Sequence, residues 1–151
     1  MFTIPCTISG VKVDRAMLDL GVSINVMPYS LYETIKLGPL RETSVVIQLA
    51  DRSNTYPRGV IEDVMVEVDK LVFPADFYVI DMSHDDYADS ILLGRPFLGT
   101  TRMKINVYTG ALTVGREEEV VKLSIFDCMK KPKFKKYVCR LDSLKTSDKV
   151  T

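Results

Sequence analysis

One aspartate in this chain stands where its carboxyl group is suited to chemistry. From residue 17 the chain reads Met-Leu-Asp-Leu-Gly-Val-Ser, so an apolar run delivers Asp19 to a glycine. Aspartate is depleted inside strands and common in turns. Two interpretations stay open from these residues alone. Asp19 forms a strand-end turn, which is the commoner meaning of Asp-x-Gly, or it is an acid–base group held in a dry place.

Other catalytic and metal-binding groups are scarce. His84 is the only histidine, so a metal centre built on several histidines is excluded. A Ser-His-Asp triad would have to use this same residue, which lies in an acidic loop over residues 81–89. That loop lacks the glycine and glutamate of a calcium-binding loop. We expect neither a metal nor a cofactor.

Length and composition predict one ordered domain with a tail. The 151 residues are 46% hydrophobic and 26% charged, as in ordinary globular proteins. Residues 1–126 hold 12 Lys and Arg against 17 Asp and Glu, whereas residues 127–151 hold 8 against 3. We therefore expect a domain over residues 1–126 and a flexible basic C-terminal tail over residues 127–151. We interpret these basic residues as a solvated segment and not as a nucleic-acid-binding site, because no nucleic-acid-binding motif accompanies the charges.

Cysteine usage and hydropathy predict the compartment. Cys6, Cys128 and Cys139 are an odd number without close pairing, which indicates free thiols in a reducing environment. The N-terminus lacks a basic region followed by a long apolar one, and no apolar run approaches membrane-spanning length. We expect an intracellular protein, cytoplasmic or nuclear, without membrane association.

Strands must position Asp19. Residues 2–8 and 11–18 are rich in strand-forming residues, and Ser9-Gly10 between them predicts a hairpin that ends at Asp19. Residues 22–27 predict a further short strand. Pro28 then opens a helix, because proline needs no N–H donor there, and Gly38-Pro39 ends it.

The middle of the chain predicts a long hairpin. Residues 45–49 and 60–68 are expected to pair across a polar tip, and residues 60–68 show a half-buried alternation of period two. Further strands are expected at residues 73–80, 103–107, 111–114 and 121–125. Residues 90–93 predict a strand that enters a glycine, a proline and a short helix. This repeats the Asp19 theme without the aspartate, so the chain has two related halves.

The order of three motifs resembles the retropepsin-like aspartic proteases, in particular those of plant long-terminal-repeat retrotransposons. The first motif is Leu18-Asp19-Leu20-Gly21. The second is flap-like and runs from Leu49-Ala50-Asp51-Arg52-Ser53 to Gly59-Val60-Ile61. The third is Ile91-Leu92-Leu93-Gly94-Arg95-Pro96-Phe97-Leu98. The resemblance spans residues 2–126 and leaves the basic tail unassigned.

This resemblance implies a mostly β, closed-barrel protomer with two short helices that is half of a two-fold dimeric protease. Asp19 would be catalytic, paired with Asp19 of a second copy, because two carboxylates about 3 Å apart share one proton. The homodimer would cleave extended peptide segments of a polyprotein. The implied active-site loop is Leu20, Gly21, Val22 and Ser23, and the implied structural partner motif is Leu92, Leu93 and Gly94. The implied flap is Asp51, Arg52, Ser53, Asn54, Thr55, Tyr56, Pro57, Arg58 and Gly59.

Leu20 departs from the family pattern, which has Thr or Ser at this position. The usual hydroxyl bonds across the dimer interface, and leaving its buried partner unpaired would cost about 1–3 kcal/mol per side. A buried leucine contributes roughly 1.5–3 kcal/mol in return. Two hypotheses follow. The chain is an active aspartic endopeptidase, or it is a catalytically impaired dimerisation or peptide-binding module of a retroelement-derived protein.

Overall fold

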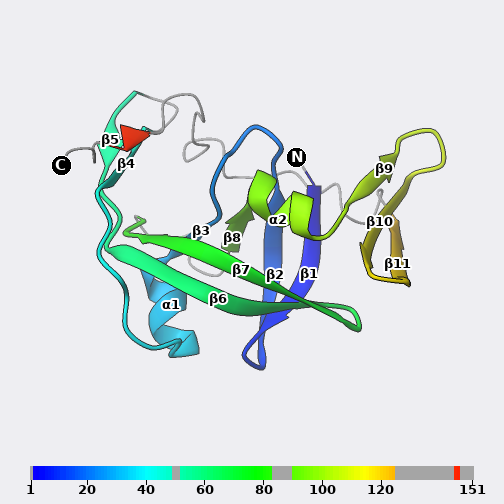
Figure 1. The fold of residues 1–151 in the computed structure, drawn as a ribbon, viewed down its shortest axis with the longest axis horizontal. Coiled ribbons are helices and arrows are strands. Elements are labelled where there is room, and N and C mark those ends of the chain that lie inside the picture. Colours follow the sequence, from blue (N-terminus) through cyan, green and yellow to red (C-terminus); the bar gives the residue numbers. More distant parts are fainter. Residues whose placement is uncertain (1, 49–51, 83–89, 125–144, 147–151) are drawn as a thin grey trace.

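The computed structural model describes residues 2–48, 52–82, 90–124 and 145–146 (Figure 1). Its elements are, in chain order, β1 (Phe2–Ile8), β2 (Val11–Leu18), β3 (Val26–Pro28), α1 (Tyr29–Ile35), β4 (Val45–Gln48), β5 (Asn54–Thr55), β6 (Gly59–Val68), β7 (Leu71–Ile80), β8 (Ser90–Leu93), α2 (Arg95–Thr100), β9 (Lys104–Asn106), β10 (Ala111–Arg116), β11 (Glu119–Ser124) and β12 (Lys145–Thr146). The predicted fold class, mostly β with two short helices, is confirmed.

Six strands close into a barrel in the order β1-β2-β8-β3-β7-β6. The pairs β2–β8 and β3–β7 are parallel, and the long β6–β7 hairpin crosses the front of the barrel in Figure 1. Along β6 the valines at 60, 64, 66 and 68 are buried while Asp63, Met65 and Glu67 are exposed, which confirms the predicted alternation. Phe73 and Phe97 are fully buried and meet edge-on, so α2 packs onto the barrel through an aromatic contact.

The first hairpin forms as predicted and ends at Asp19. Ser9 and Gly10 both have positive φ, 49° and 80°, which is the backbone that a two-residue hairpin turn requires. On β1, Cys6 is buried, and burial raises the pKa of its thiol to about 12. The thiol therefore stays neutral and unreactive near pH 7, in line with the prediction of a free cysteine. Cys128 and Cys139 lie outside the described residues.

The strand predicted over residues 22–27 is shorter than expected. Only Val26–Pro28 forms β3, because the backbone of residues 22–25 bonds to the turn after β8 and to β7 instead of joining a ladder. The first helix is also shorter than expected. It ends at Ile35, where Lys36 adopts a left-handed conformation and donates its N–H to Tyr32, two residues before Gly38.

The predicted pairing of residues 45–49 with residues 60–68 is wrong. β4 pairs with β5, whereas β6 pairs with β7 on one edge and, on the other, with Arg41 near its start and with β1 near its end. β12, near the C-terminus, pairs with the other edge of β4. A separate three-stranded sheet has the order β11-β10-β9 and lies at the opposite end of the molecule from β4 and β5 in Figure 1.

Two sequence predictions fall largely outside the described residues. These are the acidic loop with His84 and the boundary between the domain and the basic tail. Within the part of the chain that is described, no helix has the length and apolarity to cross a bilayer.

Candidate active site

Asp19 lies at the end of β2, where the chain leaves the barrel and turns. Its own N–H donates to the carbonyl of Leu93 at 3.0 Å, and its carbonyl accepts from the N–H of Val22 at 3.3 Å. The N–H of Gly21 donates to Asp19 Oδ1 at 2.8 Å. One carboxylate oxygen is thus fixed by the turn itself, and the side chain stays partly exposed.

The turn after β8 supports the turn after β2. The parallel register pairs Leu18 with Leu93, which places Gly94 beside Asp19. A Cβ at Gly94 would lie 2.3 Å from the carbonyl oxygen of Ile24 and 2.5 Å from that of Val22. Only a glycine fits against the active-site loop at this point. The next residue, Arg95, donates its N–H to Val22 at 2.8 Å and so joins the two turns.

Asn25 connects the active-site loop to two other elements. Its Oδ1 accepts the N–H of Gly94 at 2.9 Å, and its Nδ2 donates to the carbonyl of Asp76 at 3.0 Å. Its backbone carbonyl accepts the N–H of Tyr78 at 2.9 Å. Asn25 is buried and its bond to Gly94 is made away from water, where an unpaired partner would be costly. Asn25 therefore positions the loop that carries Asp19.

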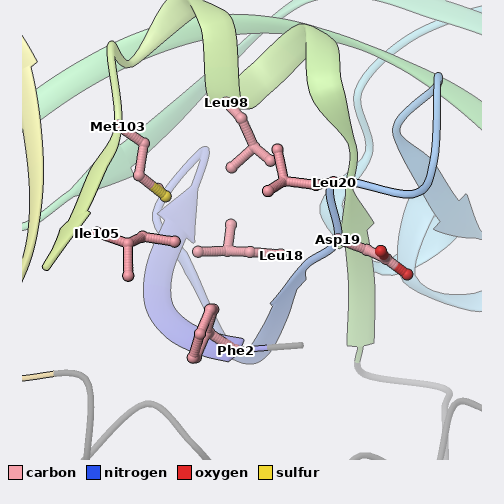
Figure 2. Close-up of a pocket in the computed structure, with 7 residues that line it drawn as sticks. All are labelled: Phe2, Leu18, Asp19, Leu20, Leu98, Met103 and Ile105. Atoms are coloured by element: carbon pink, nitrogen blue, oxygen red, sulfur yellow. The ribbon is translucent and has the colours of Figure 1, made fainter. Parts of the chain in front are cut away.

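An apolar pocket of about 420 Å³ adjoins the Asp19 turn (Figure 2). Its lining residues come from β1, β2, the turn, α2, and β9 with the residue just before it, and they are Phe2, Leu18, Asp19, Leu20, Leu98, Met103 and Ile105. In Figure 2 the leucine side chains point into this space, and the carboxylate of Asp19 points away from it. Leu20 is 65% exposed, although it is a large apolar side chain.

The fold and the loop geometry agree with a comparison of the sequence to known families. The family model for aspartyl protease matches residues 4–97. The chain belongs to the aspartyl protease family. The matched range includes Asp19, the flap segment and the turn after β8, which are the three segments of the predicted motifs.

A solved structure supports a retropepsin-like version of this family. The chain is similar to the retroviral protease-like domain of Ddi1 from Leishmania major, with 26% sequence identity and a TM-score of 0.58. The alignment covers 84% of this chain and 94% of that one. No curated protein sequence matches the chain significantly. The retropepsin-like barrel is therefore established for this aspartyl protease family member.

The strand before the flap segment, β4, packs against the active-site loop through apolar side chains. Ile47 on β4 is fully buried in one cluster with Val22 and Ile24 of the loop. At the base of the segment, Arg58 lies 3.6 Å from the centre of the Tyr29 ring and donates to Asp81 at 3.0 Å. This hydrogen bond holds the pKa of Arg58 above its ordinary value.

The predicted flap residues do not gather around the apolar pocket. None of residues 52–59 lines it, Tyr56 is 69% exposed, and Asp51 lies outside the described residues. The predicted partner residues behave differently. Leu92, Leu93 and Gly94 are buried directly against the turn that carries Asp19.

Ser23 follows the Asp19 turn and faces a different hollow. Its Oγ is buried and has no hydrogen-bond partner among the described residues. The residue lines a polar pocket of about 400 Å³ together with Asn25, Asp76, Tyr78 and Thr100. The active-site loop therefore separates two pockets, an apolar one beside Leu20 and a polar one beside Ser23.

The sequence analysis missed Asn25 and most of the apolar pocket. A signal for Asn25 was present, because it is the one polar amide inside the apolar run from Val22 to Met27. No comparable signal marks Phe2, Met103 or Ile105, which reach the pocket from distant parts of the chain.

Proposed function

We propose that this chain is an aspartic endopeptidase that acts as a homodimer, with Asp19 as its catalytic residue. The observation that carries the proposal is the Asp19 turn, whose carboxylate is fixed by the N–H of Gly21 at the end of a barrel strand. The chain contains one Asp-x-Gly sequence, whereas the chemistry needs two adjacent carboxylates. A second copy related by a two-fold axis supplies the other one.

The two Asp19 carboxylates divide the work between an ionised and a protonated form. Because they lie about 3 Å apart, they hold one proton between them. The ionised group takes a proton from water as the water oxygen attacks the peptide carbonyl carbon, and the other group gives its proton to the carbonyl oxygen. Collapse of the tetrahedral intermediate breaks the C–N bond, and the leaving nitrogen receives a proton from the dyad.

The substrate in this proposal is an extended peptide segment of a polyprotein. The flap, residues 51–59, closes over it and supplies main-chain hydrogen bonds while excluding water. Ser23 contributes a hydroxyl that has no partner among the described residues. The active-site loop is held in place by the residues that pack against it, which are Leu92, Leu93 and Gly94.

The parent polyprotein and the cellular location are proposed from the resemblance to plant retrotransposon proteases. We assign residues 1–126 to the protease domain of a plant retrotransposon polyprotein and residues 127–151 to a basic tail. The site of action is the cytoplasm. The mechanism as proposed uses no metal and no cofactor.

A second candidate function rests on Leu20. Its side chain is 65% exposed and offers no hydroxyl for a bond between the two active-site loops. A looser dyad would leave a dimerisation or peptide-binding module with weak catalysis, since such sites need placement within about 0.5 Å. Leu20→Thr distinguishes the two. A rise in cleavage by orders of magnitude identifies an impaired enzyme, and an unchanged or lower rate identifies a site already adapted to leucine.

The test of the main proposal is cleavage of a peptide mixture at mildly acidic pH. We expect Asp19→Asn to lower kcat/KM by about 1,000-fold or more, because the base is lost. Asp14→Asn is the matched control, since Asp14 is an exposed aspartate on the same strand. Equal cleavage by the parent protein and Asp19→Asn, or none by either, would contradict the proposal.

Mixing tests whether the site is shared. At constant total chain concentration, equal amounts of the parent and Asp19→Asn chains should give about one quarter of the parent activity, because only parent homodimers carry a complete dyad. A site contained in one chain would leave one half. The mixture must be equilibrated long enough for subunits to exchange, which mass spectrometry of isotopically labelled chains checks.

A further inference from the structure

The polar pocket beside Ser23 lies where β6 departs from regular pairing with β7. In this pairing β6 carries one extra residue, so that Glu62 and Asp63 together oppose Asp76 on β7. Asp63 has a left-handed backbone with a φ of 56°, and its N–H donates to Asp76 Oδ1 at 2.9 Å. A bulge of this kind changes the direction of side chains. As a result, three exposed carboxylates line one pocket.

The negative charges of this pocket are only partly neutralised by the chain itself. Arg41 is the one basic residue among the described residues that line it, and Arg41 is bonded to Glu62 at 2.7 Å. In the part of the chain that is described, neither Asp63 nor Asp76 forms an ion pair. Two carboxylates at the pocket therefore lack a cation, and a positively charged ligand would supply one.

The rest of the lining suits a long side chain that ends in a cation. Six lining residues are apolar, and they are Ile24, Val60, Pro74, Ala75, Pro96 and Phe97. The Oγ of Ser23, which lines the same pocket, is buried and has no hydrogen-bond partner among the described residues. Lysine and arginine combine an apolar stem with a charged head that donates several hydrogen bonds. Among the described residues, no group of acidic, histidine or cysteine side chains is arranged to hold a metal ion.

We propose that the polar pocket binds the side chain of a lysine or arginine in the peptide that is cleaved. This inference rests on the proposed function, because Ser23 follows Asp19 by four residues on the active-site loop. The charged head lies between Asp63 and Asp76 and donates to the hydroxyl of Ser23, while the stem packs on the apolar lining. Asp19 does not line this pocket, so the selected basic residue is not one of the two that flank the scissile bond.

The first experiment moves one lysine through an otherwise constant peptide that the full chain cleaves. At each position lysine is compared with norleucine, which has the same stem without the ammonium group. We expect kcat/KM to be about 10-fold higher for lysine at one position only, because a charge-assisted hydrogen bond forms there. The difference should come from KM, with kcat unchanged, since the pocket does not contact the reacting atoms. Equal rates for lysine and norleucine at every position would overturn the proposal.

A double variant tests whether the two carboxylates cause this preference. Asp63→Asn with Asp76→Asn removes both charges, keeps an oxygen to accept the N–H of residue 63, and places there a residue type that tolerates a positive φ. The preference for lysine should fall below about 2-fold. Glu67→Gln with Glu119→Gln is the matched control, because both glutamates are exposed and lie outside the pocket. The control should keep the preference, and a preference that survives in the double variant contradicts the proposal.

Binding without cleavage separates this proposal from the protease itself. The full chain, labelled with ¹⁵N, is titrated with N-acetyl-lysine methylamide or its norleucine counterpart and followed by NMR. We expect the lysine compound to shift the amide signals of Ser23, Asp63 and Thr100 and to bind at least about 10-fold more tightly. Such binding in a chain that cleaves nothing supports the pocket and removes the protease. Asp19-dependent cleavage without lysine binding or preference overturns the pocket and leaves the protease standing.

Discussion

The turn after β2 and the turn after β8 end two parallel, paired strands, but they present different atoms to their surroundings. The first leaves the carboxylate of Asp19 partly exposed, with one oxygen fixed by Gly21. The second has no side chain at its centre. Gly94 is buried, and its backbone lies against the carbonyls of Val22 and Ile24. We call the first the reactive turn, because its carboxylate is the proposed catalytic group, and the second the silent turn.

The difference teaches how a loop can hold a carboxylate in place without burying it. The bonds that fix the Asp19 turn come largely from the silent turn, through the carbonyl of Leu93 and the N–H groups of Gly94 and Arg95. Because backbone groups and the Asn25 amide make these contacts, none of them occupies the Asp19 carboxylate. Changes at the silent turn should therefore affect stability, and changes at the reactive turn should affect activity.

The largest effect is expected at the silent turn itself. Gly94→Ala places a Cβ 2.3 Å from the carbonyl oxygen of Ile24, and the loop cannot move away without breaking its bonds to Gly94, Arg95 and Tyr78. We expect a loss of at least about 3 kcal/mol in the free energy of unfolding, or no folded protein, measured by urea denaturation.

The control for this change is Gly99→Ala in α2, where nothing lies within 4 Å of the added Cβ. It should leave the stability unchanged or raise it by up to about 1 kcal/mol, because alanine favours a helix more than glycine does. Equal stability of the two variants would break the distinction between the two turns.

The next effect is expected at Asn25, which joins the two turns. Asn25→Ala leaves the buried N–H of Gly94 and the carbonyl of Asp76 without their partners. We expect a loss of about 2–3 kcal/mol in urea denaturation. Asn106→Ala is the control, because Asn106 also accepts a backbone N–H, at 3.1 Å from Thr109, but is exposed. A similar loss in both variants would show that the hydrogen bonds of Asn25 between the two turns stabilise the fold no more than an exposed hydrogen bond does.

Gly21→Ala should separate activity from stability at the reactive turn. The added Cβ would lie 3.1 Å from Asp19 Oδ1, which must shift by a few tenths of an ångström. We expect a change below about 1 kcal/mol in unfolding and a fall of about 10- to 100-fold in kcat, since the carboxylate is displaced. A loss of stability like that of Gly94→Ala, with activity retained per folded molecule, would reverse the assignment of the two turns.

The smallest effects are expected for two buried serines, one in each half. Ser23 and Ser90 both have an Oγ without a hydrogen-bond partner among the described residues. Replacing either by alanine should change the free energy of unfolding by less than about 1 kcal/mol. In peptide cleavage assays, KM should rise about 3- to 10-fold for Ser23→Ala only, because Ser23 lines the polar pocket beside the Asp19 turn and Ser90 does not. An equal rise for Ser90→Ala would remove that assignment.

Much of the scaffold could be predicted from the sequence because its signals are local. Alternation along β6 and the Ser9-Gly10 turn depend on neighbouring residues, and both predictions are confirmed. The pairing of residues 45–49 with residues 60–68 failed for a different reason. Strand partners are set by the closure of the whole barrel, which pairs β6 with β7 and β1.

The sequence by itself singled out the candidate catalytic residue, since one Asp-x-Gly occurs and it ends an apolar strand. Tertiary structure alone decided how that residue is held and what surface adjoins it. Asn25 reaches Gly94 across 69 positions of the chain, and the pocket beside Leu20 draws its wall from four separate elements and the turn. The residues that form a turn are adjacent in the sequence, so a turn can be predicted from it. Hydrogen bonds and cavities between distant segments exist only after the barrel has closed.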